Sequence, residues 1–212
     1  MMWISLLLLF SLFIFFSIDR KRGKRIAMIN ENRLIDYKTS RRKLRALKSD
    51  LVDNISENNK SISRDAKDLK QMVSELSQED RESFLKILDL SVYLEKTVEE
   101  AFGINFQNKR ISNGIVYEYL IQNKRETLEL NDTEVPLFVK NVEFRISSLA
   151  SNIEEYCQQL KNRISRLGLS ANVGPNLLRR LEQIQDVVLK MKDSGIKMSK
   201  LEVKRVSSKL LH

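Results

Sequence analysis

The chain begins with an uninterrupted apolar run. Residues 1–18 carry no charged side chain, and their three polar positions are serines. As a helix, residues 2–18 would extend about 25 Å, which is near the short end of what crosses a bilayer. No basic residue precedes the run and no small-residue cleavage pattern follows it, which favours a retained anchor over a cleaved signal peptide or a buried core helix. We predict a transmembrane anchor at residues 1–18.

A long polar segment follows the apolar run. Within residues 26–76, apolar side chains recur seven positions apart, and there is no glycine from Lys24 to Glu100. This spacing predicts one long helix or two in series, with a weak apolar seam. We assign residues 19–50 to a basic juxtamembrane segment and residues 51–76 to a helical stalk. A surface helix packed on a bundle is the alternative for this stalk.

Denser apolar patterns follow in residues 77–212, which we predict to form a helical bundle. The first helix spans about residues 78–102, with Ser77 capping its start and Gly103 ending it. Residues 114–121 could be a strand by composition, but no second strand of similar quality is present to pair with them, so we favour a helix.

The clearest periodicity lies in residues 133–167. Asp132 or Thr133 is placed to cap this helix and Gly168 to end it. Apolar positions three and four apart predict a continuous helix seam, which packs either within the chain or between chains as a coiled coil. The seam residues are Val139, Val142, Ile146, Leu149, Ile153, Tyr156, Leu160 and Leu167.

The C-terminal part has another stripe with three- and four-residue spacing. We expect a helix to start at Gly174 and Pro175 and to be interrupted at Ser194 and Gly195. The final segment, residues 201–211, is basic and amphipathic, which is typical of a last bundle helix or of a segment on acidic lipid.

Composition supports a helical class. The chain has six glycines and two prolines in 212 residues, too few turn residues for a many-stranded β fold. A single cysteine excludes a disulfide scaffold, and the single histidine leaves no ligand set for zinc. The predicted fold is therefore all-α: one N-terminal transmembrane helix followed by an elongated helical bundle or coiled-coil body.

The net charge of +9 is concentrated beside the apolar run. Residues 19–50 hold 12 basic and 4 acidic side chains, and the chain after them is almost neutral. Basic residues next to an anchor stay in the cytoplasm, so we expect the N-terminus outside and the body in the cytoplasm. The predicted membrane-surface residues, which would contact anionic headgroups, are Arg20, Lys21, Arg22, Lys24, Arg25, Arg41, Arg42, Lys43 and Arg45. One aromatic residue, Tyr37, lies among them, which argues against a nucleic-acid surface.

No motif indicates catalysis or a cofactor. The sequence has no glycine-rich phosphate loop, and the neighbouring acidic pairs Glu99/Glu100 and Glu154/Glu155 would diverge on a helix rather than converge. We therefore expect no enzyme, cofactor or metal site. The sequence favours a membrane-anchored cytoplasmic scaffold that binds other proteins or further copies of itself. The alternatives are an exported lysis or secretion component and a subunit of a membrane channel or transport assembly.

Overall fold

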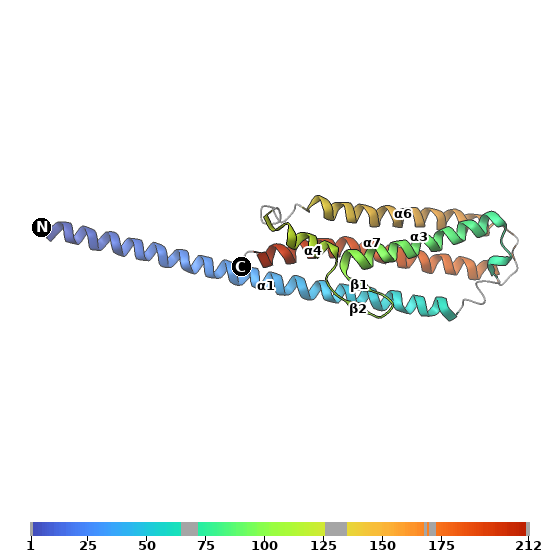
Figure 1. The fold of residues 1–212 in the computed structure, drawn as a ribbon, viewed down its shortest axis with the longest axis horizontal. Helices are drawn as coiled ribbons and strands as arrows, with labels where there is room; N and C mark the ends of the chain where they lie inside the picture. The colour runs from blue at the N-terminus through green and yellow to red at the C-terminus, as the bar shows by residue number, and fades with distance from the viewer. Residues whose placement is uncertain (1, 65–71, 126–134, 168, 170–172, 211–212) are drawn as a thin grey trace.

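The computed structural model shows a long N-terminal helix whose second half joins a bundle of three further long helices (Figure 1). The structure describes residues 2–64, 72–125, 135–167, 169 and 173–210, and side chains at these positions except 2–17, 59–64 and 210. The elements are α1 (Met2–Arg64), α3 (Gln78–Phe102), β1 (Ile104–Asn105), β2 (Arg110–Ile111), α4 (Ile115–Gln122), α6 (Leu137–Ile164) and α7 (Val173–Leu210). The predicted all-α class is confirmed.

The four long helices pack lengthwise with alternating direction. α1 and α6 run one way, and α3 and α7 run the other way (Figure 1). α7 is the central element, because it packs against α1, α6, α3 and α4. The four helices thus form a bundle of alternating direction, and the long connection from α3 to α6 contains the strands β1 and β2 and the helix α4.

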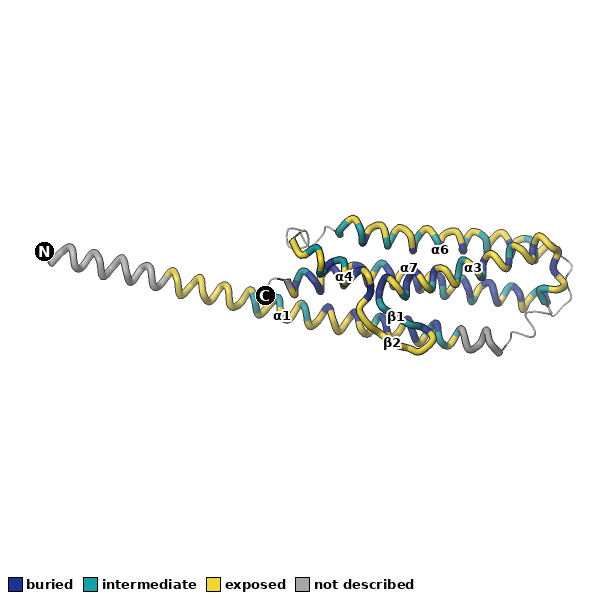
Figure 2. The backbone as a smooth tube through the Cα atoms, viewed as in Figure 1, coloured by how far each residue is buried: buried dark blue, intermediate teal, exposed yellow. Residues whose placement is uncertain are grey.

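α1 extends beyond the bundle at its N-terminal side (Figures 1 and 2). Side chains from residue 18 to residue 29 are all exposed, and burial begins at Ser40. We call residues 18–39 the exposed arm. Among the described side chains, no helix is both long enough and apolar enough to cross a membrane. Nearly all of the predicted anchor lies outside this set, so the anchor stays a prediction.

The second half of α1 belongs to the bundle. Leu44, Leu51, Val52 and Ile55 are each no more than 3% exposed, and α1 packs mainly against α7. The segment assigned to a stalk is described over residues 51–64 and 72–76, and Leu51, Val52, Ile55 and Leu76 of this segment are buried. Leu44 and Leu51 are seven positions apart, as in the predicted seam, and Val52 and Ile55 are also buried.

α3 has the bounds and both caps that the sequence predicts. Ser77 Oγ accepts a hydrogen bond from the backbone N–H of Asp80 at 3.2 Å and satisfies an unpaired donor of the first turn. Gly103 ends the helix in the left-handed conformation, with φ 65°. Its face toward the core is apolar, with Phe84, Ile87 and Leu94 no more than 1% exposed.

A short antiparallel ribbon, β1 and β2, connects α3 to α4. Its return strand passes close to the end of α3: a side chain at Gly103 would collide with the backbone of Asn113, and one at Gly114 with the backbone of Ala101. Ser112 N donates to Gly103 O at 2.6 Å across this contact. The two glycines thus fix residues 112–113 against the bundle. The prediction of a helix after Gly114 is confirmed by α4.

α7 differs from its prediction, because it is continuous through Gly195. A Cβ at this position would lie 3.2 Å from Ile146 Cδ1, so the glycine allows α7 to approach α6. The glycine is therefore a packing residue, and the predicted interruption at Ser194 and Gly195 is wrong. The last described turns also pack in the bundle, where Val206 is fully buried.

Candidate functional site

The basic residues nearest the apolar run lie on the exposed arm. Arg20, Lys21, Arg22, Lys24 and Arg25 are all exposed on successive turns of α1. Among the described contacts, packing of the bundle therefore involves none of these five charged side chains. They are free to meet an anionic surface from any side of the helix.

The second group of predicted membrane-surface residues is also exposed, but it lies on the bundle. Arg41, Arg42, Lys43 and Arg45 belong to the part of α1 that packs against α7. At 1.5 Å per residue, Arg41 is about 35 Å from Ile18 along the helix axis. This separation exceeds the Debye length of about 10 Å at 0.1 M salt. The predicted membrane-surface residues thus form two clusters on α1, which are about 24 Å apart along the helix axis from Arg25 to Arg41.

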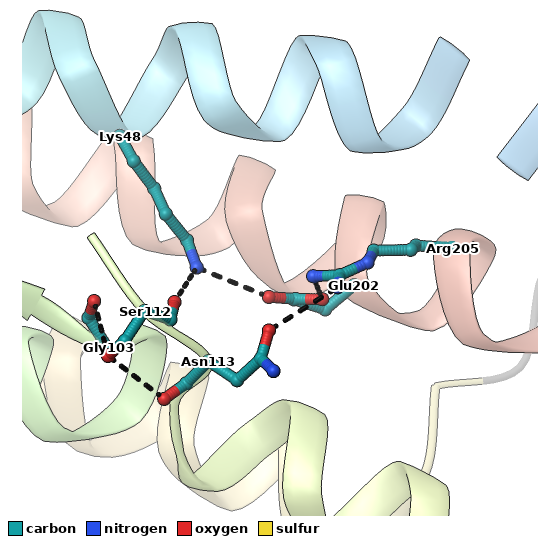
Figure 3. A network of polar contacts seen from close by, with 6 residues as sticks. All are labelled: Lys48, Gly103, Ser112, Asn113, Glu202 and Arg205. Carbon is teal, nitrogen blue, oxygen red and sulfur yellow. Dashed lines mark hydrogen bonds and ion pairs between the residues drawn. The ribbon is translucent and has the colours of Figure 1, made fainter. Parts of the chain in front are cut away.

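A buried ionic network includes Lys48, which lies about one turn after Arg45 on α1 (Figure 3). Lys48 Nζ of α1 lies 3.3 Å from Glu202 Oε1 of α7 and donates to the Ser112 carbonyl oxygen at 3.3 Å. Arg205 Nη1 donates to Glu202 Oε2 at 3.2 Å, and Arg205 Nη2 donates to Asn113 Oδ1 at 3.3 Å. The network therefore joins α1, α7 and the segment after the ribbon.

All three charges of this network are withdrawn from water. The side chains of Lys48, Glu202 and Arg205 are 2%, 0% and 10% exposed. Burial lowers the pKa of the Lys48 ammonium, the Glu202 carboxylate opposes this shift, and the Arg205 charge adds to it. The Glu202 carboxylate thus pairs with two cations, so the buried network has one more positive charge than negative charge.

Tyr117 of α4 closes the other side of the network. The Arg205 guanidinium lies 4.1 Å from the centre of its ring, within the range of a cation–π contact. Lys209 Nζ donates to the Tyr117 hydroxyl at 3.2 Å. Because arginine stacks on aromatic faces with its planar group, Tyr117 fixes the plane in which Arg205 presents its N–H groups.

A groove of about 540 Å³ opens above the network, between α1, the ribbon and α7. Five cationic side chains line it, from three different elements, and no carboxylate is among its described lining residues. Arg42 and Lys43, which neighbour two of the lining arginines, do not line it. The lining residues are Arg41, Leu44, Arg45, Lys48, Lys109, Ile111, Ser112, Asn113 and Arg205.

The predicted seam of residues 133–167 lies on α6 and faces its own chain. Val139, Ile146, Ile153 and Leu160 are fully buried against α3 and α7. The alternate positions Val142, Leu149 and Tyr156 are half-buried, and three residues not included in the seam are buried beside it. These three are Ala150, Cys157 and Ile164. The buried stripe is therefore wider than a strict heptad seam, as in a helix that packs on two neighbours.

The ends of this helix differ from the prediction. α6 begins at Leu137, with Pro136 at the cap position, and the predicted caps Asp132 and Thr133 lie outside the described residues. The helix ends at Ile164, and the chain turns through residues 165–167. Leu167 is consequently 41% exposed and does not continue the seam.

The described residues show no arrangement suited to a metal or a nucleophilic cysteine. No group of three His, Cys, Asp or Glu side chains in this part of the chain could hold a metal ion. Cys157 is fully buried, and burial raises the pKa of its thiol to about 11. A thiol that stays protonated at neutral pH is a poor nucleophile, so Cys157 acts as a small core residue.

Comparison with known proteins finds no matching family model, and no curated protein or solved structure significantly similar to the chain. The function is therefore argued from the residues of this chain alone.

Sequence reasoning did not predict the buried network. Lys48 lies between Leu44 and Leu51 on the apolar stripe of α1, and Glu202 lies on the inner face of α7. The sequence does contain a signal for this pair. Two different helices each carry a charge, of opposite sign, at a position where an apolar residue is expected. Arg41 and Arg45 were predicted as membrane-surface residues, and the structure places both in the lining of the groove.

Proposed function

We propose that the protein is a membrane-anchored tether that holds a helical bundle at a distance from the bilayer, where the bundle organises partner proteins without catalysis. The supporting observation is the continuity of α1 from Met2 to Arg64, which places the predicted anchor and the bundle on one helix. From Ile18 to Asp36, whose carboxylate pairs with Lys204 of α7, this helix rises about 27 Å. A helix of this length acts as a spacer.

The charges of the exposed arm suit the point where such a helix would leave the bilayer. Each basic residue near an anionic leaflet contributes about 1 kcal/mol, and this contribution decays within a Debye length. Residues 20–25 hold five basic side chains at this point. They would bind anionic headgroups and, by the positive-inside tendency, retain the body in the cytoplasm.

A reporter at the C-terminus that is active only in the cytoplasm tests the orientation. It should be active in the unmodified chain. Changing Arg20, Lys21, Arg22, Lys24 and Arg25 to Gln and adding lysines before Trp3 should invert the topology and silence the reporter. A body that external protease digests in intact cells or spheroplasts would reject the cytoplasmic tether and favour the exported alternative.

The two basic clusters give a matched test of the headgroup contact. A fragment that lacks residues 1–18 should bind anionic vesicles at low salt and dissociate as salt increases. Changing the five basic residues between positions 20 and 25 to Gln should remove most of this binding. Changing Arg41, Arg42, Lys43 and Arg45 to Gln should remove little of it. Equal loss in both variants would mean that α1 lies flat on the surface, and the spacer proposal would fail.

A further inference from the structure

We propose that the groove lined by Arg41, Arg45, Lys48, Lys109 and Arg205 is a binding site for a small phosphorylated molecule that carries two or more phosphate groups. This site is separate from the predicted membrane contact of the exposed arm. It rests on the geometry of the bundle and does not require the membrane-tether proposal to be correct.

The charges around the groove are not balanced. Five cations line it, and two carboxylates pair with them: Glu202 with Lys48 and Arg205, and Asp53 with Lys109 at 2.8 Å. Five positive charges less two negative charges leave three uncompensated. Within the described part of the chain, neither Arg41 nor Arg45 forms an ion pair. A polyvalent anion would complete this arrangement.

The cations are also positioned in a way that suits phosphate. Arg41 and Arg45 are one helical turn apart, and Lys48 follows after nearly another turn, so the three lie on one side of α1. Each guanidinium can donate two parallel N–H bonds to phosphate oxygens, and Lys48 adds a point charge at the floor of the groove. Arg205 lies on the opposite wall, fixed by Tyr117 and Asn113.

The floor of the groove is pre-formed rather than assembled from loose side chains. Lys48 and Arg205 are almost completely buried, and both are held by Glu202. The segment 112–113 is pinned by the glycine contacts at the end of α3. Because these groups are ordered before binding, little conformational entropy is lost when an anion binds.

Size and position indicate what kind of anion can bind. A volume of about 540 Å³ lies within the range of small-molecule sites, and Leu44 and Ile111 are its two apolar lining residues. The lining thus favours a compact, highly charged molecule over an apolar one. Arg45 is about 40 Å along α1 from Ile18, so a headgroup in the membrane of the predicted anchor would be out of reach of an upright helix.

The test is calorimetric titration of the full-length chain, in a neutral detergent, with inorganic diphosphate at constant ionic strength. The groove variant, Arg41→Gln with Arg45→Gln, should bind diphosphate at least about tenfold more weakly than the unmodified chain. The control variant, Arg42→Gln with Lys43→Gln, removes the same charge from the same turns of α1 but not from the groove. It should bind within about twofold of the unmodified chain.

A second arm identifies the source of the phosphate. The same titrations with a short-chain phosphatidic acid, in the same detergent, offer a lipid phosphate without a bilayer. Tighter binding of diphosphate that depends on Arg41 and Arg45 supports the proposal, whereas tighter binding of the lipid, which carries a single phosphate group, would overturn it. Absence of saturable binding to either probe, or equal weakening in the groove and control variants, would overturn the proposal.

Discussion

The ammonium of Lys48 and the carboxylate of Glu202 lie 3.3 Å apart across the interface between α1 and α7, where both side chains are almost fully buried. Burying such charges costs free energy that only close pairing offsets. The two partners are not equivalent, because Glu202 also pairs with Arg205, whereas Lys48 has only the Ser112 carbonyl oxygen besides Glu202 among its described contacts. We therefore expect the loss of the Glu202 carboxylate to destabilise the fold more than the loss of the Lys48 ammonium.

Removing the carboxylate should be strongly destabilising. Glu202→Gln leaves two buried cations, Lys48 and Arg205, without their counter-charge, and we expect it to lower the free energy of unfolding by about 3–5 kcal/mol. Lys48→Met should cost less, since Glu202 keeps Arg205 as its partner. Chemical denaturation of the unmodified chain and of the two variants, followed by circular dichroism, measures the loss of stability in each variant.

The reverse order of stability would contradict the network. If Lys48→Met were the more harmful substitution, Glu202 would depend on Lys48 rather than on Arg205 for its counter-charge, because methionine keeps most of the packed aliphatic chain. Lys204→Met provides the control on α7, because Lys204 is 56% exposed and its ion pair with Asp36 spans 3.7 Å at the surface. Its effect should stay near or below about 1 kcal/mol.

Glu95 of α3 should make stability depend on pH. Burial, helped by the nearby charge of Glu99, raises the pKa of the Glu95 carboxyl from 4.5 to about 7. The folded chain thus keeps a proton that the unfolded chain has already lost. The free energy of unfolding should therefore fall as pH increases from about 4.5, and the loss should be complete above about pH 7.

The variant Glu95→Gln removes this titration. Relative to the unmodified chain, it should gain stability between about pH 5 and pH 8, as measured by denaturation midpoints at each pH. Glu100→Gln is the control, because Glu100 is exposed on the same helix and should not change the profile. Parallel pH profiles for the unmodified chain and Glu95→Gln would contradict this interpretation.

The parts of the fold that sequence predicted depend on local interactions. Ser77 and Gly103 cap α3 through hydrogen bonds and backbone angles within a few residues, so the bounds of this helix could be inferred from the sequence. The buried positions of α6, such as Ile146 and Ile153, followed from helical spacing alone. Periodicity did not distinguish a seam within the chain from one between chains.

What sequence did not predict depends on contacts between distant segments. Glycine is unfavourable inside a helix, so the sequence alone predicts an interruption at Gly195. In the fold, the missing side chain lets α7 pack closely against Ile146 of α6. The strands β1 and β2 have two residues each, too few to show an alternating pattern. The groove joins Arg45 and Arg205, which are 160 positions apart in the sequence, so no local pattern could have indicated it.

Ile153 should be a main stabilising residue of the bundle. It is fully buried in the middle of α6, and Ile153→Ala should lower the free energy of unfolding by about 2–5 kcal/mol because it leaves a cavity between helices. The adjacent Asn152 is exposed, and Asn152→Ala should change stability by about 0.5 kcal/mol or less. Thermal or chemical denaturation compares the two. Equal effects would mean that this face of α6 is not buried.

We expect a large side chain at position 195 to destabilise the fold. A Cβ at this position would be 3.2 Å from Ile146 Cδ1 and 3.8 Å from Phe102 Cε2, so small additions are just tolerated and large ones are not. Gly195→Ala should be close to neutral, because a gain of up to about 1 kcal/mol in helix propensity opposes the tight contact with Ile146. Gly195→Leu should separate α7 from α6 and cost about 1–3 kcal/mol or more.

The control for Gly195→Leu is Lys197→Leu, two residues further along α7 at an exposed position. It adds the same side chain to the same helix without entering the core, so the free energy of unfolding should hardly change. The difference between the two leucine variants, measured by chemical denaturation, isolates the contact between α7 and α6. If both leucines are equally well tolerated, α6 does not pack on α7 at Gly195, and the continuity of α7 would need another physical cause.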